Sequence, residues 1–193
     1  MQSNLEFVTD GSVVYRLGGN EWYAVMQDND KVMLVDTDCK VGDKTLKTPW
    51  SSGDWMSEDG ENGQTILDYG NNIADTYFNN IKHAIETRTV EAGTGKLENA
   101  LMWSMSFEEF DGNRVVGGKI VENSNSYVWT RTFGGTNRNC RYAWRINNIY
   151  GELFYNCIDG VYCVAPAFYL RKSAIDHIND DGEIVLKPED NID

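Results

Sequence analysis

Cysteine and histidine side chains are the first candidates for chemistry in this sequence, because they act as nucleophiles, bases and metal ligands. The cysteines are Cys39, Cys140, Cys157 and Cys163. Structural metal sites use closely spaced pairs such as Cys-x-x-Cys, and neither such a pair nor a finger-like interval to His83 or His177 occurs. The spacing predicts no metal and no cofactor. It favours free thiols, with a Cys140–Cys157 disulfide expected only if the protein matures outside the cell.

Motifs of catalysis and phosphate binding are also absent. The sequence contains no Gly-x-Gly-x-x-Gly, no P-loop and no Gly-x-Ser-x-Gly. Glu108 and Glu109 could form a carboxylate pair, but neighbouring helical residues point about 100° apart, so we interpret them as favourable charges at a helix N-terminus. The acidic stretches 36–43 and 176–181 lack the spacing of a calcium loop and predict a solvated face. We therefore expect a protein that is not an enzyme.

Composition narrows the possible partners. The 193 residues include 17 Lys and Arg against 30 Asp and Glu, a net charge of −13. Such a charge disfavours binding to nucleic acid or to an anionic membrane. The longest apolar stretches fall well short of the roughly 20 residues of a membrane helix, and residues 1–7 do not resemble a signal peptide. We expect no nucleic-acid partner and no membrane insertion.

The elements that must position any site form an α+β pattern in one domain spanning residues 1–193. Apolar residues at helical spacing predict a helix over residues 72–86, with Asn71 or Asn72 as its N-cap. Ser106 and Glu109 form the pattern of a capping box and predict a short second helix that ends at Gly112. Residues 42–63 are expected to be a surface excursion held by Trp50 and Trp55, and residues 115–126 an irregular connection. Strands are expected at residues 13–17, 21–26, 31–35, 97–105, 127–133, 140–146, 153–156, 162–170 and 184–186.

One quarter of the chain differs from the rest. Residues 129–172 contain six basic and two acidic residues, and they hold ten of the 23 aromatic residues. Tyr, Trp, Arg and Asn in loops are typical of recognition surfaces, because they offer large contact areas and adaptable hydrogen bonds. We interpret Trp129, Trp144 and Phe168 as core residues. We expect exposure for Tyr142, Tyr150, Tyr155 and Tyr162.

The ordered motifs of this region carry a family resemblance. Trp129-Thr-Arg131, Ala143, Gly151 and the closing Tyr162-Cys-Val-Ala-Pro-Ala-Phe-Tyr-Leu170 resemble the C-terminal module of variable proteins diversified by retroelements. The stretches 15–25 and 101–109 resemble the rest of the related bacterial and phage C-type-lectin-like domains. Many relatives have Val-Arg-Pro-Ala where this chain has Val-Ala-Pro-Ala, so the subfamily stays open.

The resemblance implies a C-type-lectin-like fold with short antiparallel strands, two helices and long loops, as a frame for a variable ligand-binding segment at residues 129–170. It implies a non-enzymatic receptor-binding protein of a phage tail or a bacterial surface, which binds a protein or glycan ligand and could form a homo-oligomer. Trp129, Arg131, Trp144, Gly151 and Pro166 would be scaffold. The expected ligand-binding residues are Thr136, Asn137, Arg138, Asn139, Arg141, Tyr142, Asn147, Asn148, Tyr150, Phe154, Tyr155, Asn156, Asp159 and Tyr162.

The resemblance also implies a test within the sequence. Diversification replaces adenines, chiefly in AAC-type codons, which cannot become codons for Trp, Lys, Met, Gln or Glu. Residues 134–162 contain two residues of these five types, Trp144 and Glu152, where the composition of the whole chain would place about 5.6. No Glu-Pro-Asn, Gln-Pro-Asp or Trp-Asn-Asp motif is present, so a calcium-dependent sugar site is not expected.

Two other interpretations remain open. The stretches 131–136 and 141–145 faintly resemble motifs of formylglycine-generating oxidases, whose chemistry needs two thiols that converge on copper, and Cys157 with Cys163 is the nearby candidate pair. The chain could also be a purely structural virion or surface protein whose loops bind nothing.

Overall fold

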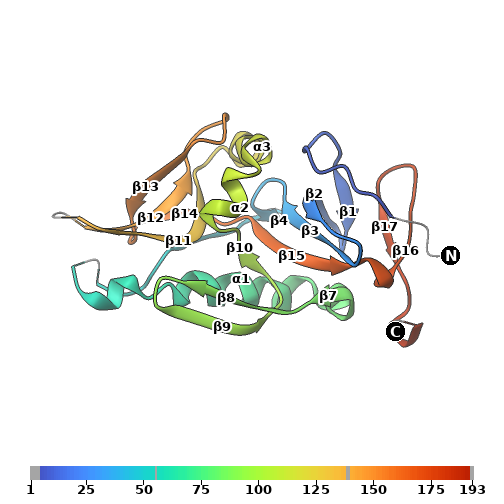
Figure 1. Ribbon diagram of the computed structural model, residues 1–193, viewed down its shortest axis with the longest axis horizontal. Helices are drawn as coiled ribbons and strands as arrows, with labels where there is room; N and C mark the ends of the chain where they lie inside the picture. Colours follow the sequence, from blue (N-terminus) through green and yellow to red (C-terminus); the bar gives the residue numbers. More distant parts are fainter. Residues whose placement is uncertain (1–4, 55, 138–139, 192–193) are drawn as a thin grey trace.

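The computed structural model describes residues 5–54, 56–137 and 140–191 of the chain (Figure 1). Within these residues it has two larger β-sheets, three small two-stranded sheets, three α-helices and four short 3-10 helices. The second sheet, with β11 to β14, lies toward one end of the elongated molecule, the first sheet occupies its middle, and α1 runs along one side (Figure 1). The expected α+β class is confirmed.

The first sheet is built on two successive hairpins near the N-terminus. Its strand order is β1-β2-β3-β15-β10, and β7 also pairs with β15. Gly18 and Gly19 supply the positive φ angles of +64° and +84° that the first turn needs. Pairing of β15 with β3 joins a late segment of the chain to an early one. The strands are β1 (Tyr15–Leu17), β2 (Asn20–Gln27), β3 (Lys31–Asp36), β7 (Ile85–Glu86), β10 (Trp103–Ser104) and β15 (Pro166–Arg171).

The second sheet contains most of residues 129–170, the segment expected to bind a ligand. Its order is β13-β12-β11-β14-β6, in which β11 and β14 are parallel and the other pairs antiparallel. Strand β13 lies at an edge, so no further strand of the sheet covers its outer side. The strands are β6 (Lys47–Pro49), β11 (Val128–Thr136), β12 (Arg141–Ile146), β13 (Leu153–Cys157) and β14 (Val161–Cys163).

The first long helix differs from its predicted bounds. Helix α1 spans Gln64–Tyr77, and a 3-10 helix follows at Asn79–Ala84. Asn71 does not cap a helix; its side chain accepts a hydrogen bond from the backbone N–H of Leu101, 2.8 Å away. The apolar face that drives the helix into the core begins earlier, at Ile66 and Leu67. The prediction of an N-cap at Asn71 or Asn72 was therefore wrong.

The second helix agrees with prediction, and a third corrects it. Helix α2 (Phe107–Asp111) begins at the Ser106 capping box and ends at Gly112. Residues 115–126 were expected to be irregular, but helix α3 (Arg114–Ser124) occupies nearly all of them. Helix α3 buries one face of apolar residues. Gly118 allows the helix backbone to approach Ile149 closely, since a Cβ at position 118 would lie 2.0 Å from the carbonyl oxygen of Ile149.

Small hairpins and 3-10 turns complete the chain. The other strands are β4 (Lys40–Val41), β5 (Lys44–Thr45), β8 (Arg88–Ala92), β9 (Gly95–Ala100), β16 (Ile175–Ile178) and β17 (Ile184–Leu186). The remaining 3-10 helices are Glu58–Glu61, Lys172–Ala174 and Glu189–Asn191. The strand predicted over residues 97–105 is thus divided between β9 and β10.

Four fully buried tryptophans, Trp22, Trp50, Trp103 and Trp129, anchor the core. The indole of Trp50 donates to the carbonyl oxygen of Thr130 at 3.1 Å, so Trp50 anchors its segment as expected. The prediction of a surface excursion over residues 42–63 was wrong in part, because β6 lies within them and pairs with β14 in the second sheet. Trp55 lies outside the described residues. In the part of the chain described, no helix combines the length and apolar character needed to cross a bilayer.

Candidate ligand-binding face

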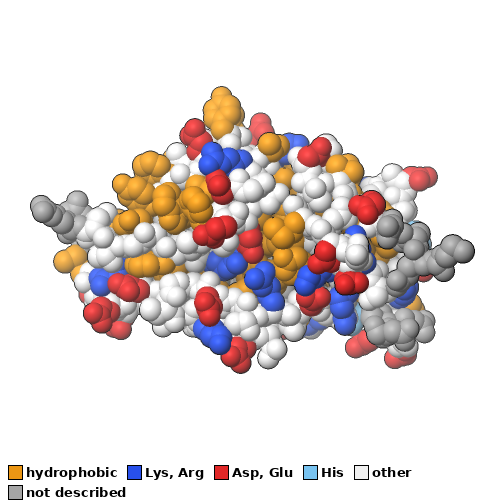
Figure 2. All heavy atoms as spheres, viewed as in Figure 1, with side chains coloured by type: hydrophobic (Ala, Val, Ile, Leu, Met, Phe, Trp, Pro, Cys, Tyr) orange, Lys and Arg blue, Asp and Glu red, His pale blue; other side chains and the backbone are white. Residues whose placement is uncertain are grey.

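Aromatic side chains gather on the edge of the second sheet. We call Phe107, Tyr142, Trp144, Phe154 and Tyr155 the aromatic face; the neighbours Phe154 and Tyr155 leave β13 on opposite sides, so the group reaches both sides of this edge strand. The Tyr155 ring lies 4.7 Å from that of Tyr142 and 6.0 Å from that of Trp144, and Trp144 packs 4.8 Å from Phe107 of α2. Phe154 and Tyr155 stack at 5.0 Å with their planes 6° apart. Figure 2 shows hydrophobic side chains collected over β12 and β13.

Two of these rings, and Tyr150 in the adjoining loop, are open to solvent. Phe154 is 50% exposed, Tyr155 44% and Tyr150 75%. Contiguous exposed apolar groups are a feature of interaction surfaces, so this hairpin is the candidate site of the described residues. The exposure expected for Tyr150 and Tyr155 is confirmed, whereas Tyr142 and Tyr162 are half-buried.

The loop that presents Tyr150 has a fixed conformation. The Asn148 side chain accepts hydrogen bonds from the backbone N–H groups of Tyr150 and Glu152, at 3.0 and 3.3 Å. Gly151 has a φ of +70°, and a Cβ there would lie 1.9 Å from the carbonyl oxygen of Arg114. Asn148 therefore shapes the loop, and Gly151 is scaffold as predicted.

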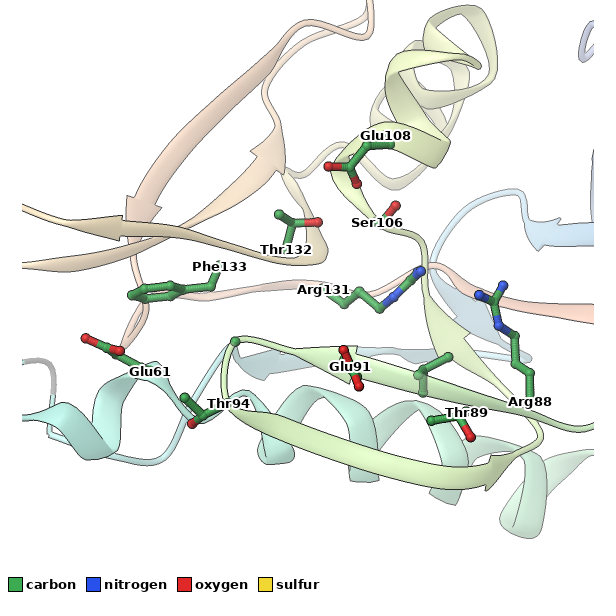
Figure 3. Close-up of a pocket in the computed structure, with 12 residues that line it drawn as sticks. Glu61, Arg88, Thr89, Glu91, Thr94, Ser106, Glu108, Arg131, Thr132 and Phe133 are labelled. Atoms are coloured by element: carbon green, nitrogen blue, oxygen red, sulfur yellow. The ribbon is translucent and has the colours of Figure 1, made fainter.

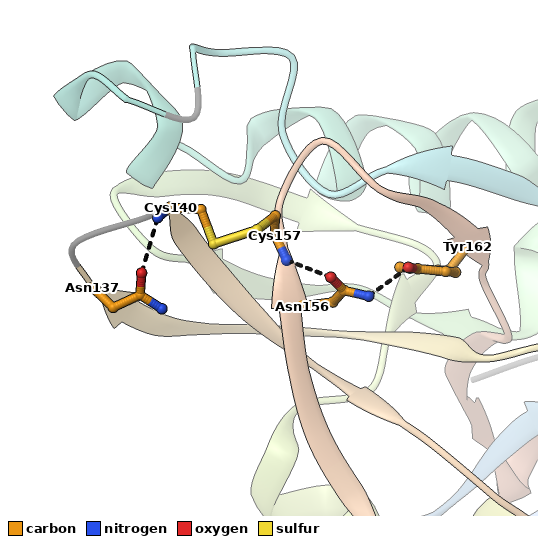
Figure 4. The surroundings of a disulfide bond; sticks show 5 residues. All are labelled: Asn137, Cys140, Asn156, Cys157 and Tyr162. Atoms are coloured by element: carbon orange, nitrogen blue, oxygen red, sulfur yellow. Dashed lines mark hydrogen bonds between the residues drawn. A yellow bond between two sulfur atoms is a disulfide. The ribbon is translucent and has the colours of Figure 1, made fainter.

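A disulfide closes the other end of the β12–β13 hairpin. Cys140 and Cys157 are bonded, with their Cα atoms 5.8 Å apart (Figure 4). The preference for free thiols at these positions was wrong, because the antiparallel pairing of β12 and β13 brings both cysteines to the same end. Next to the bridge, Asn156 donates to the Tyr162 hydroxyl at 2.5 Å.

A buried ion pair joins the second sheet to helix α2. The Arg131 guanidinium donates to both carboxylate oxygens of Glu109, at 2.6 and 3.1 Å, and to the carbonyl oxygen of Ser104 at 2.9 Å. Burial alone would raise the pKa of Glu109, but the Arg131 hydrogen bonds and charge hold it below its ordinary value. Arg131 is thus committed to α2 and is not free to bind a ligand.

A second cluster lies around Arg145, which sequence reasoning did not select. The guanidinium carbon is 3.7 Å from the ring centroid of Tyr127 and 5.2 Å from that of Tyr162. Its Nη1 donates to the Asn147 side chain at 2.8 Å. Because Tyr127, Arg145 and Tyr162 are distant in sequence, only the folded sheet brings them together.

A polar cavity of about 640 Å³ opens between β8 and β11 (Figure 3). Its wall includes Glu61, Glu91 and Glu108. Arg88 and Arg131 also line it, but both are paired with Glu109. Neither a thiol nor an imidazole is among the described lining residues, so the cavity offers hydrogen-bonding groups without a strong nucleophile.

The predicted ligand-binding residues divide into three groups. Tyr142, Phe154 and Tyr155 join the aromatic face, while Asn147, Asn156 and Tyr162 lie near Arg145. The other described positions sit in turns or at strand ends, and Arg138 and Asn139 lie outside the described residues. These other positions are Thr136, Asn137, Arg141, Asn148, Tyr150 and Asp159.

Three of the predicted positions are held by other parts of the chain. Arg141 pairs with Glu61 at 3.2 Å. Asn137 accepts a hydrogen bond from the backbone N–H of Cys140 at 2.9 Å. Asn148 bonds within its own loop. They shape the surface more than they offer free groups to a ligand.

The oxidase interpretation requires the free thiols of Cys157 and Cys163 to converge, and Cys157 has no free thiol. Cys157 is bonded to Cys140, and Cys163 is a buried free thiol that interacts with Cys39. The Cys39 interaction, opposed by burial, lowers the pKa of Cys163 to about 6. The described residues contain no group of three or more His, Cys, Asp and Glu side chains arranged to hold a metal ion.

Comparison of the chain with protein-family models, with curated proteins and with solved structures found no match. Function must therefore be argued from the residues of the two surface clusters.

Proposed function

We propose that this protein is a non-enzymatic ligand-binding protein whose β12–β13 hairpin carries a variable recognition surface on a fixed scaffold. The observation that carries the proposal is the half-exposed aromatic face next to the highly exposed Tyr150. Exposed aromatic rings provide contact area at a low cost in conformational entropy. The ligand would be a protein or a glycan on a cell surface, as the resemblance implies.

The scaffold supports this role because it fixes the hairpin at both ends. The Cys140–Cys157 disulfide closes one end, and the Asn148 hydrogen bonds with the close approach of Gly151 to Arg114 shape the other. A frame fixed in this way can tolerate changed side chains on its surface while the backbone keeps its course.

We also propose a C-type-lectin-like fold for the chain. Pairing of the late strand β15 with the early strand β3, and a second sheet formed mainly from the segment between them, are consistent with that fold. A phage tail or bacterial surface location belongs to the same proposal and rests on the resemblance alone.

Alanine substitution tests the recognition surface. The triple variant Tyr150→Ala, Phe154→Ala, Tyr155→Ala should lose at least about tenfold in retention on an array of bacterial surface glycans and proteins, since exposed aromatic residues carry much of the binding energy. A matched control replaces three exposed apolar residues elsewhere, Val8, Met56 and Val115, by Ala and should bind as wild type. Equal retention of both variants would favour a purely structural protein.

A further inference from the structure

Arg145 is a buried cation without an acidic partner. It is 7% exposed, and among the described residues no carboxylate oxygen lies within 4 Å of its guanidinium. Its Nε is buried and has no hydrogen-bond partner. A buried guanidinium normally pairs with a carboxylate, because leaving the charge uncompensated costs free energy.

A comparison with Arg131 shows how unusual this is within the same sheet. Both arginines are over nine-tenths buried. Arg131 makes a two-pronged contact with Glu109, whereas the side-chain oxygens that Arg145 meets, those of Asn147 and Tyr127, belong to an amide and a phenol and carry no charge. Of these two arginines, only Arg131 has its charge balanced by a carboxylate of the described residues.

Aromatic and amide groups surround the Arg145 guanidinium. Tyr127, 41% exposed, lies over it, and Phe154, 50% exposed, is directly opposite Arg145 in the pairing of β12 with β13. Side chains directly opposite one another in a sheet share a face. The Asn147 side chain accepts from Arg145 through its oxygen, so its amide N–H groups remain to donate to a hydroxyl. Asn156 is held by Tyr162 and by the backbone N–H of Cys157 and only shapes the cluster.

We propose that Arg145 binds the carboxylate of an acidic sugar, with Tyr127 and Phe154 against the sugar ring. The inference rests on the proposed function and assigns a ligand class to that surface. A guanidinium recognises a carboxylate through two parallel N–H···O bonds. Aromatic rings beside amides favour a sugar over an acidic peptide. The net charge of −13 opposes a polyanion but accommodates one local carboxylate.

Nuclear magnetic resonance of the whole protein tests this directly. Two probes, methyl β-D-glucuronide and methyl β-D-glucoside, differ mainly in one carboxylate. A third, N-acetyl-aspartate amide, represents an acidic peptide. The glucuronide should shift the Arg145 Nε–Hε signal saturably, with an affinity at least about tenfold above that of the glucoside. This measurement needs no variant, so it does not depend on how a substitution affects folding.

Variants then assign the effect to Arg145. Arg145→Gln should lose at least about tenfold in glucuronide affinity. The matched control Arg16→Gln removes the same charge from the first sheet, where Arg16 bonds to the carbonyl oxygen of Asp181, and should bind as wild type.

Three results would overturn the inference. They are equal affinity for glucoside and glucuronide, no shift of the Arg145 signal in the millimolar range, and aspartate binding as tight as glucuronide binding. The last would assign the cluster to acidic peptides. None of these results contradicts the proposed function if the triple aromatic variant still loses retention. Failure of the acidic-sugar site can therefore be distinguished from failure of the proposed function.

Discussion

Glu109 links the start of α2 to the second sheet. Its side chain accepts from the Ser106 backbone N–H at 2.7 Å in the capping box and also holds the Arg131 guanidinium. One carboxylate therefore stabilises a helix end and neutralises a buried cation. Its neighbour Glu108 is exposed and does neither.

Removing the Glu109 charge should be costly. Glu109→Gln should lower the free energy of unfolding by about 3 kcal/mol, because it leaves Arg131 buried without its counter-ion. Urea denaturation measures this. The control Glu108→Gln should change stability by less than about 0.5 kcal/mol. Equal effects of the two substitutions would show that the ion pair contributes little.

Asp36 should make stability depend on pH. Burial raises its pKa to about 7, against the lowering effect of backbone hydrogen bonds from residues that include Asp38 and Lys40. The folded state thus binds a proton more tightly than the unfolded state, whose carboxyl has a pKa of 3.8. The stabilisation is complete below pH 3.8 and is lost as pH rises through 7, a change of up to about 4 kcal/mol.

The variant Asp36→Asn should flatten this dependence between about pH 4 and 7, as measured by urea denaturation across that range. Asp43→Asn, at an exposed carboxylate nearby, should keep the wild-type profile. Parallel profiles for wild type and Asp36→Asn would contradict the assignment.

At the scale of elements, Gly151 holds the loop end of the β12–β13 hairpin against Arg114. Gly19, in the first sheet, is a matched control, because it also has a positive φ but a Cβ there would meet nothing within 4 Å. Gly19→Ala should cost about 1–2 kcal/mol for its backbone conformation alone. Gly151→Ala should cost at least about 2 kcal/mol more, because the backbone of Arg114 must move. Similar melting temperatures for the two variants would argue against close packing at Gly151.

The disulfide should stabilise the same hairpin. Its cysteines are 17 residues apart, and a loop of this size predicts a loss of about 3 kcal/mol on reduction. Urea denaturation with and without reductant measures the loss. In the double variant Cys140→Ser, Cys157→Ser, reductant should have no effect. An equal effect of reductant on wild type and variant would show that it acts elsewhere.

Local sequence signals predicted the elements whose causes are local. The Ser106 capping box and the Gly18–Gly19 turn depend on neighbouring residues, and both were found. The start of α1 and the existence of α3 depend on distant packing, as at Gly118 against Ile149, and were missed. Residue type was enough to select Tyr142, Phe154 and Tyr155. Trp144 was predicted to lie in the core but is half-buried, and Phe107 was not selected. The Arg145 cluster could not be predicted as a group, because its members meet only across the folded sheet.

At the scale of the molecule, charge and aromatic residues divide between two parts. Residues 129–172 are mildly basic within a chain of net charge −13, and they supply β11 to β15. The acidic remainder provides the three helices, the small hairpins, β6 of the second sheet and every strand of the first sheet except β15. This division fits a scaffold that carries a separate recognition surface.

Sequencing many copies of the coding gene and its neighbourhood tests the central claim most directly. The account predicts a nearby reverse transcriptase and a near-identical template repeat that differs at adenines. Substitutions should be concentrated at surface positions such as Tyr150, Phe154 and Tyr155, while Trp129 and Gly151 stay constant. Variation spread evenly over surface and scaffold codons, or no variation and no template repeat, would contradict the account.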